Sequence, residues 1–324
     1  MNINKEKVLN NTSGRDIIAK MYQSIYQRSI EREVSATGVG IHSGNPVTMR
    51  LVPAKPGEGI QFVLQYGGAN KGTNKVTDTV KIPAHFSMVK NTMLATTLTS
   101  GDANISTVEH LMATLSAFSV DNLTIYVDGS ELPVMDGSAA ELVLLLNSGG
   151  IVETKQKREF AVVTDKISVK SGDSWATLTP KEGGLFIDYT IVYENPHVGT
   201  QRFEFKLTPD FFVKEIAPAR TFGLLEDVQS MYKQGLALGG TLENALIIGD
   251  DGVLNPDGFR FPDECVRHKC LDALGDLALF GMPIIGKFTA YKSGHMLNHL
   301  LVKELSESGK YHIVEGRAEE KVDL

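Results

Sequence analysis

The sequence is poor in cysteine and tryptophan and has no long apolar run. Its 324 residues include two cysteines and one tryptophan. Cys265 and Cys270 lie five residues apart on one predicted helix and point in different directions, so no disulfide bond is expected between them. A chain without disulfides is typical of a reducing cytoplasm. No apolar run reaches the ~18 residues of a membrane span, so stable membrane insertion is not expected.

An excess of positive charge is also missing. The formal net charge is -7, with 42% hydrophobic and 22% charged residues, the composition of a soluble globular protein. A nucleic-acid-binding protein needs a basic face, so no nucleic-acid partner is expected. Local lysines and arginines can still bind an anionic small molecule. Residues 1–28 lack the apolar core of a signal peptide and are interpreted as an amphipathic extension, for which contact with a membrane surface is an alternative role.

Hydrophobic periodicity predicts an α+β fold with the same pattern in each half. Strands are predicted at 47–52, 60–64, 92–98 and 122–127 in the first half and at 159–169, 175–178, 185–193 and 284–291 in the second. Each half also has two predicted helices. We therefore expect a first α+β domain at 29–152, a polar linker at 152–158, a second domain at 159–312 and a tail at 313–324. Residues 223–260 are interpreted as an insertion in the second domain that is apolar enough to line a tunnel.

One predicted helix, beginning near Pro262, concentrates ionisable side chains on one flank. At about 100° per residue, His268, Asp272, Asp276 and Lys269 fall within roughly 100° of one another, whereas leucines and alanines occupy the other flank. His268 and Asp272 lie one turn apart and can reach the same point in space. This spacing indicates half of an active site.

A second helix, in ISTVEHLMATLSAF (105–118), carries Glu109 and His110. Two histidines and one carboxylate match a catalytic zinc site with a free coordination position, and an adjacent Glu109 is the expected general base. Several alternatives remain open. Ser106 and Glu109 can form a capping box, His110 can be a core residue, Cys265 can be a ligand, and the same triad describes non-haem iron sites.

The segment FTAYKSGHMLNHLL (288–301) places His295 at a helix start after Gly294. A histidine there can protonate a leaving group, and Asp276 is the candidate that orients it, although helix capping is the alternative. Thr221, in APARTFG (217–223), offers a hydroxyl donor for a developing oxyanion. Neither a dinucleotide-binding fingerprint nor a phosphate-binding P-loop occurs.

Seven motifs occur in an order that resembles the zinc-dependent UDP-3-O-acyl-N-acetylglucosamine deacetylases of lipid A biosynthesis. They span roughly residues 27–312 and read TGVGIHSG, STVEHLMATL, ELPVMDGSA, ARTFG, LGGTLENA, DECVRHKCLDALGDL and AYKSGHMLNHLL. The resemblance implies two similar α+β domains, each a sheet packed with helices, that form a β-α-α-β sandwich with the active site between the helix layers. It also implies a cytoplasmic monomer that removes the acetyl group of an acylated UDP-N-acetylglucosamine.

The resemblance also implies roles for individual residues. Zn²⁺ would be held by His110, His268 and Asp272. Glu109 would be the general base and His295 the general acid, with Asp276 behind it. Lys269 and Thr221 would help to bind the substrate and to stabilise charge. The insertion at 223–260 would enclose the acyl chain. The substrate-binding residues would further include Phe222, Tyr193, Asp227, Gly240 and His42. A rival interpretation is a catalytically silent sugar-nucleotide or lipid-binding protein with a structural zinc.

Overall fold

The computed structural model describes residues 24–66 and 78–316. The predicted amphipathic extension therefore lies outside the described residues, apart from its last five positions. Among the described residues, no helix combines the length and the apolarity that a membrane span requires. The described part is a mixture of helices and strands, in agreement with the predicted α+β class.

A five-stranded sheet is built from the first half of the chain. β4 pairs with β9 in parallel, and the other neighbours are antiparallel. Its strands, in spatial order, are β2 (Val34–Val39), β3 (Pro46–Pro53), β9 (Leu123–Val127), β4 (Ile60–Tyr66) and β5 (Asp78–Pro83).

A seven-stranded sheet is built from the second half. β19 is its centre and pairs with β13 in antiparallel fashion, and with β14 and β11 in parallel. Its strands are β12 (Ile167–Ser171), β13 (Ser174–Thr179), β19 (Ile284–Tyr291), β14 (Leu185–Val192), β15 (Thr200–Lys206), β11 (Glu159–Val163) and β20 (Tyr311–Glu315).

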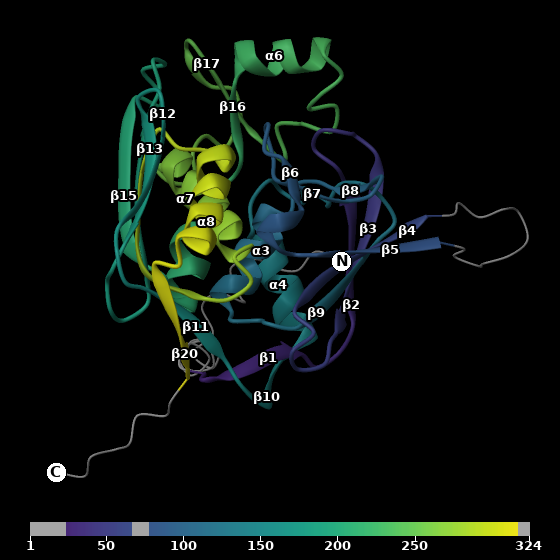
Figure 1. Cartoon of the computed structure of the whole chain (residues 1–324). Helices are drawn as coiled ribbons and strands as arrows, with labels where there is room; N and C mark the ends of the chain where they lie inside the picture. Colours follow the sequence, from purple (N-terminus) through teal and green to yellow (C-terminus); the bar gives the residue numbers. More distant parts are fainter. Residues whose placement is uncertain (1–23, 67–77, 317–324) are drawn as a thin grey trace, which may run out of the picture.

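The two sheets share one strand order and one placement of helices. The first has the order β2-β3-β9-β4-β5, and the second contains the order β12-β13-β19-β14-β15. A helix precedes each central strand and another follows it. These helices are α3 (Glu109–Ala117) before β9, α4 (Ala140–Gly149) after it, α7 (Glu264–Ala278) before β19 and α8 (His295–Ser308) after it. In Figure 1 all four helices lie between the two sheets.

The core sits where the inner faces of the sheets meet these helices. Burial alternates along β9 and β19, because successive side chains of a strand point to opposite faces and only one face meets the helices. Leu51, Phe62 and Ile125 are fully buried in the first sheet, as are Ile187 and Phe288 in the second.

Helices α3 and α7 approach each other closely because a glycine lies at their contact. A Cβ atom added to Gly275 would lie 2.0 Å from the carbonyl oxygen of Glu109. Only glycine can occupy this position without moving one helix away from the other. The contact brings the Glu109–His110 segment to the face of α7 that carries Asp272.

Smaller elements surround this frame. The predicted insertion contains a helix and short strands that stand above the sheets in Figure 1. Its elements are β16 (Phe222–Leu224), α6 (Leu225–Lys233), β17 (Leu246–Gly249) and β18 (Gly252–Val253). The other small strands are β1 (Tyr26–Ile30), β10 (Ile151–Lys157), β6 (Val89–Asn91), β7 (Thr97–Ser100) and β8 (Ala103–Ile105). The other short helices are the 3-10 helix η1 (Phe86–Met88), α5 (Pro209–Phe211) and the π-helix η2 (Phe212–Ile216).

Several predicted element boundaries differ from those in the structure. The linker predicted at 152–158 is strand β10, which pairs with β1, and β1 itself begins within the predicted extension. The tail predicted from residue 313 begins inside β20, which pairs with β11. Of the strand predicted at 92–98, only the last two residues lie in a strand, β7; residues 92–96 form a bend in which Leu94 has a positive φ of 67°. The strand predicted at 159–169 is two strands, β11 and β12.

Candidate active site

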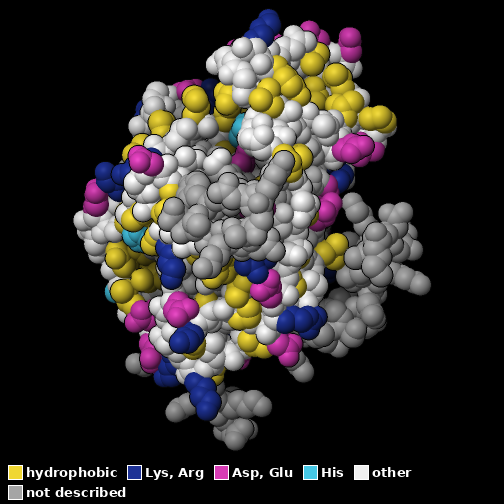
Figure 2. All heavy atoms as spheres, turned by 90° about the vertical axis from the view of Figure 1, so that its right-hand side faces the viewer, with side chains coloured by type: hydrophobic (Ala, Val, Ile, Leu, Met, Phe, Trp, Pro, Cys, Tyr) yellow, Lys and Arg dark blue, Asp and Glu magenta, His cyan; other side chains and the backbone are white. Residues whose placement is uncertain are grey.

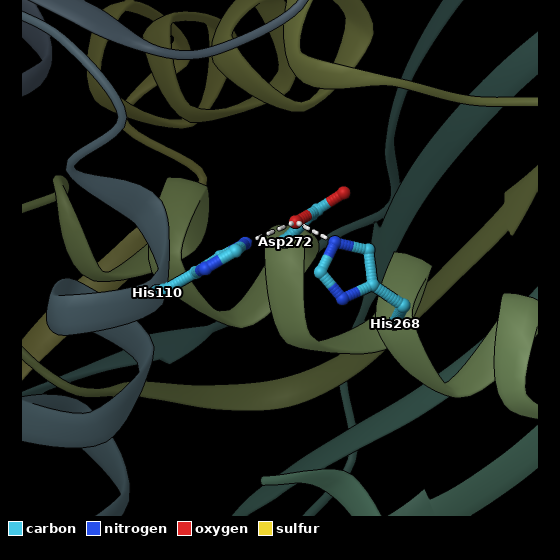
Figure 3. Close-up of side chains that lie close together, drawn as sticks. All are labelled: His110, His268 and Asp272. Carbon is cyan, nitrogen blue, oxygen red and sulfur yellow. Dashed lines mark ion pairs between the residues drawn. The ribbon is translucent and has the colours of Figure 1, made fainter. Parts of the chain in front are cut away.

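Three buried side chains from two helices converge on one point (Figure 3). The Nε2 atoms of His110 and His268 lie 3.5 Å and 3.3 Å from Oδ1 of Asp272. The centres of the two imidazole rings are 5.0 Å apart, and the ring planes are perpendicular. One ligand atom from each residue lies within 4.8 Å of the other two. The close contact of α3 with α7 therefore brings together the three predicted ligands.

The surroundings of these side chains suit a divalent cation. His268 donates its Nδ1 hydrogen to the carbonyl oxygen of Ala219 at 3.1 Å, which leaves the Nε2 lone pair facing Asp272. Burial lowers the pKa of His268 to about 3, so the ring is the neutral form that binds metal. Burial alone would raise the pKa of Asp272, but the Lys269 ammonium at 2.9 Å holds it well below its usual value. The donor set is thus two imidazoles and one carboxylate, which fits Zn²⁺.

Glu109 lies beside this cluster and is 3% exposed. Its Oε2 accepts a hydrogen bond from the backbone N–H of Thr96 at 3.1 Å, and its Oε1 lies 3.8 Å from Nε2 of His295. Burial raises the pKa of this carboxyl group. The capping-box alternative is wrong, because the residue that caps α3 is Val108, with no side-chain capping bond, and Ser106 accepts a bond from Thr97 instead.

His295 is the first residue of α8 and is fixed by a buried carboxylate. Its Nδ1 donates to Asp276 at 2.9 Å, and Asp276 also accepts from Asn298 at 2.9 Å and from Thr96 at 2.6 Å. Burial would lower the pKa of His295, but Asp276 and Glu109 raise it to about 9. His295 makes no side-chain cap for α8. A charged imidazolium and the carboxyl group of Glu109 therefore face each other next to the candidate metal ligands.

A cavity of about 750 Å³ opens above these groups. It is lined by the three ligands, Glu109, His295, Lys269, Thr221, and the predicted substrate-binding residues Phe222, Gly240 and His42. The backbone of Thr221 is fixed by bonds to Gly137 and Leu246. Tyr193 and Asp227 do not line the cavity. Tyr193 packs edge-on against Phe222 with ring centres 5.6 Å apart, and Asp227 is exposed on α6.

Cys265 does not join the cluster of ligands. It is fully buried, and the group of side chains that could hold a metal ion consists of His110, His268 and Asp272 without it. Three groups that orient the predicted residues were not predicted from the sequence: Thr96, Asn298 and the carbonyl of Ala219. Asn298 shares a motif with His295 and could have been included, whereas a backbone carbonyl leaves no signal in a sequence.

A triad of two histidines and an aspartate that lines a cavity, with a buried glutamate and a charged histidine beside it, is typical of metal-dependent hydrolases. Comparison with known proteins agrees with this class. The family model described as LpxC, UDP-3-O-acyl N-acetylglycosamine deacetylase, matches residues 27–307. The chain therefore belongs to this family.

Similar proteins cover nearly the whole chain. A UDP-3-O-acyl-N-acetylglucosamine deacetylase of Myxococcus xanthus is 46% identical over 298 residues, 92% of each chain. The protein of the same name from an Anaeromyxobacter species is 43% identical, over 89% of this chain and 91% of its own length. That from Brucella melitensis is 42% identical, over 90% of this chain and 99% of its own length.

Proposed function

We propose that this protein hydrolyses the acetamide of a UDP-3-O-acyl-N-acetylglucosamine. The products are acetate and the free 2-amino sugar, and the reaction is the committed step of lipid A biosynthesis. Membership of the deacetylase family supports the substrate class. The observation that carries the reaction type is the buried carboxylate of Glu109 next to the His110, His268 and Asp272 cluster. A purely structural metal site needs no such base, which argues against a silent binding protein.

The two imidazoles and Asp272 would hold the metal, which we propose is Zn²⁺. A bound Zn²⁺ supplies Lewis acidity that makes a water molecule more acidic and polarises a carbonyl group. The hydrogen bond from His268 to Ala219 keeps the Nε2 lone pair available. Lys269 holds the second oxygen of Asp272 at 2.9 Å, which leaves Oδ1 facing the histidines.

Glu109 and His295, which face each other beside the ligands, carry out the two proton transfers of the reaction. Glu109 accepts the proton that the attacking water loses, and the backbone N–H of Thr96 fixes its other oxygen. The hydroxyl of Thr221 donates to the carbonyl oxygen of the amide as negative charge develops there. Charged His295 then donates a proton to the amide nitrogen as the carbon–nitrogen bond breaks, with Asp276 favouring the charged ring.

The cavity and the fold provide the framework for this reaction. We infer that four residues that line the cavity contact the substrate: Phe222, Gly240, His42 and Lys269. Tyr193 would support the ring of Phe222. Asp227 would lie at the outer edge of the site. The insertion would enclose the acyl chain. The shared strand order supports two similar domains that form a β-α-α-β sandwich around the site. We also infer a cytoplasmic monomer, in keeping with the free thiols of Cys265 and Cys270, and size-exclusion chromatography with light scattering tests the monomer.

An acetate-release assay on the purified protein tests the proposed function. The acylated UDP-N-acetylglucosamine should release acetate, chelation should abolish the release, and added Zn²⁺ should restore it. Elemental analysis of the purified protein distinguishes zinc from iron, and an anaerobic assay excludes an oxygenase because hydrolysis needs no oxygen. Absence of acetate from a zinc-loaded, folded sample would overturn the proposal.

A further inference from the structure

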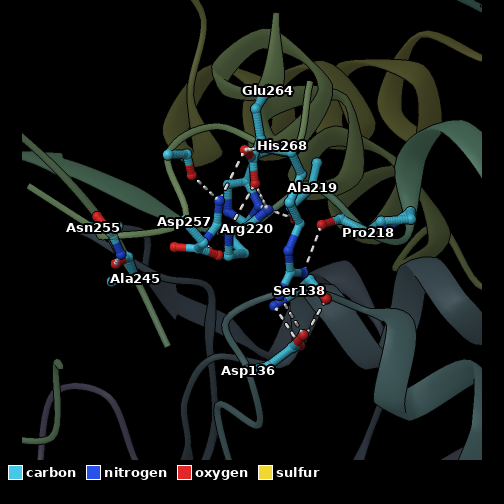
Figure 4. Close-up of polar contacts among 12 residues, drawn as sticks. Asp136, Ser138, Pro218, Ala219, Arg220, Ala245, Asn255, Asp257, Glu264 and His268 are labelled. Atoms are coloured by element: carbon cyan, nitrogen blue, oxygen red, sulfur yellow. Dashed lines mark hydrogen bonds and ion pairs between the residues drawn. The ribbon is translucent and has the colours of Figure 1, made fainter. Parts of the chain in front are cut away.

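One peptide bond before β16 is held at both ends by side chains of α7. The peptide joins Ala219 to Arg220 (Figure 4). Its carbonyl oxygen accepts the Nδ1 hydrogen of His268 at 3.1 Å, and its N–H donates to Oε1 of Glu264 at 3.0 Å. Glu264 and His268 are four residues apart, so they lie one above the other on the same face of the helix. A carboxylate is thereby connected to a metal ligand through a single peptide unit.

The carboxylate of Glu264 cannot turn away from this peptide. The residue is 0% exposed, and the side chain of Arg220 beside it is 2% exposed. Arg220 donates its Nε hydrogen to Oε1 at 2.9 Å and an Nη2 hydrogen to Oε2 at 3.3 Å. The backbone N–H of Arg260 donates to Oε2 at 2.6 Å. Each carboxylate oxygen of Glu264 therefore accepts at least one hydrogen bond.

The neighbouring carbonyl groups also have fixed donors. The oxygen of Ala217 accepts from the N–H of Ala139 at 2.8 Å, and that of Pro218 accepts from Nη1 of Arg260 at 2.9 Å. Arg260 is in turn paired with Asp136 at 3.0 Å. Of these three consecutive carbonyl groups, only that of Ala219 accepts from a metal ligand.

We propose that Glu264 is a positioning residue for His268 and acts through the Ala219–Arg220 peptide bond. A charged acceptor on the N–H polarises the peptide and strengthens its carbonyl as an acceptor. A stronger acceptor at Nδ1 fixes the ring with its Nε2 lone pair toward Asp272 and makes it a better ligand. The inference rests on the proposed metal site and concerns metal affinity, not the chemical step.

A second arginine–carboxylate pair provides a control. Asp121 accepts from Nε of Arg158 at 2.9 Å and from the backbone N–H of Arg28 at 2.9 Å, so it shares with Glu264 an arginine Nε donor and a backbone N–H donor. The side chains of Arg158 and Asp121 are 7% and 18% exposed. Neither Asp121 nor Arg158 lines the cavity above the metal ligands. Loss of this pair should weaken the fold without reaching His268.

The experiment compares Glu264→Gln with Asp121→Asn. The Zn²⁺ dissociation constant is measured by competition with a chromophoric chelator, and the stability of the metal-free protein by urea unfolding. Both variants should be less stable than the unmodified protein. Glu264→Gln should raise the dissociation constant about tenfold or more, and Asp121→Asn should leave it unchanged. Equal effects of the two variants on the dissociation constant, or no effect of Glu264→Gln, would overturn the proposal.

A measurement on the unmodified protein covers the case in which Glu264→Gln does not fold. NMR of the zinc-loaded protein labelled with ¹⁵N-histidine should show a protonated, slowly exchanging Nδ1 on His268. A Nδ1 without a proton would contradict the arrangement. Failure of the unmodified protein to bind Zn²⁺ at all would instead contradict the proposed function, so the two failures are distinguishable.

Discussion

The floor and the upper wall of the cavity differ in how firmly the fold holds them. The floor consists of Glu109, His110, His268, Asp272 and His295, each between 2% and 8% exposed and hydrogen-bonded or paired with neighbours. The wall consists of the residues of 222–254 that line the cavity, and its helix α6 contains no buried residue. Figure 2 shows apolar side chains gathered over the upper part of one face, at the height of α6 in Figure 1.

This difference separates two requirements of the proposed reaction. Chemistry needs groups fixed to within a fraction of an ångström, which close packing between α3 and α7 provides. Enclosing an acyl chain needs apolar surface that can adjust to the chain, and Tyr232, Leu242 and Leu254 are each more than 40% exposed. Changes in the floor should therefore alter turnover, and changes in the wall should alter substrate preference.

The largest effect is expected for the proton acceptor of the floor. Glu109→Gln keeps the shape and the bond from Thr96 but removes the basic oxygen. General acid–base groups typically contribute ~10²–10⁴-fold, so kcat should fall by a factor in this range. Zinc content, measured by elemental analysis, should remain at one ion per chain. Near-normal turnover would show that Glu109 is not the base.

The close contact beneath the floor should be the next most sensitive position. Gly275→Ala places a Cβ 2.0 Å from the oxygen of Glu109, so α3 and α7 must separate. We expect a loss of about 3 kcal/mol in the free energy of unfolding, together with weaker zinc binding. Urea unfolding measures the free energy of unfolding, and competition with a chelator measures zinc binding.

Gly149→Ala is the matched control for this change. Gly149 is also a helical glycine, but its added Cβ would meet its nearest atom at 3.4 Å, an ordinary contact. This variant should be as stable as the unmodified protein or more stable. Equal stability of the two variants would show that the helices can separate freely, contrary to a rigid floor.

A change in the wall should affect substrate preference alone. Met231→Trp narrows the cavity from α6, where the absence of buried residues lets the fold tolerate a larger side chain. KM for a long-acyl substrate should rise about tenfold, because one methylene group that no longer fits an apolar pocket has an effect of at least about this size. Neither kcat on a short-acyl substrate nor zinc content should change. Ser230→Trp, on the same helix but outside the cavity, should leave both substrates unaffected.

The smallest effect is expected at a carboxylate that belongs to neither region. Arg202 at 2.8 Å and Lys287 at 2.9 Å lower the pKa of Asp188 against the opposing effect of burial. A lowered folded-state pKa means that Asp188 stabilises the fold above the unfolded-state value of about 3.9, and that this contribution disappears as pH falls through the folded-state value. Asp188→Asn should cost about 1–2 kcal/mol near pH 7 and progressively less below pH 4.

Urea unfolding from pH 7 downward measures this dependence, and kinetic constants at pH 7 should stay unchanged. Glu204→Gln is the control, because Glu204 contacts the same two cations but its side chain is 45% exposed. It should have little effect at any pH. An equal loss at pH 7 and pH 3 for Asp188→Asn would show that the ion pair does not cause the stabilisation.

The predictions from sequence were good where burial follows a periodic pattern. The ionisable flank of α7 was visible because its opposite flank is apolar, and the central strands β9 and β19 alternate as one-sided strands do. Two of the errors fell on β10 and β20. Both have mostly exposed side chains, so they are held by backbone hydrogen bonds and show no apolar alternation.

Sequence by itself determined the chemistry on each helix: the spacing of His268 and Asp272 within one turn, and the adjacency of Glu109 and His110. Only the tertiary structure decided that these pairs meet, because the meeting depends on a glycine-sized gap between α3 and α7. It also decided that Thr96 and Ala219 orient the reacting groups. They do so through a backbone N–H and a backbone carbonyl, which nearly every residue possesses and which no residue type reveals.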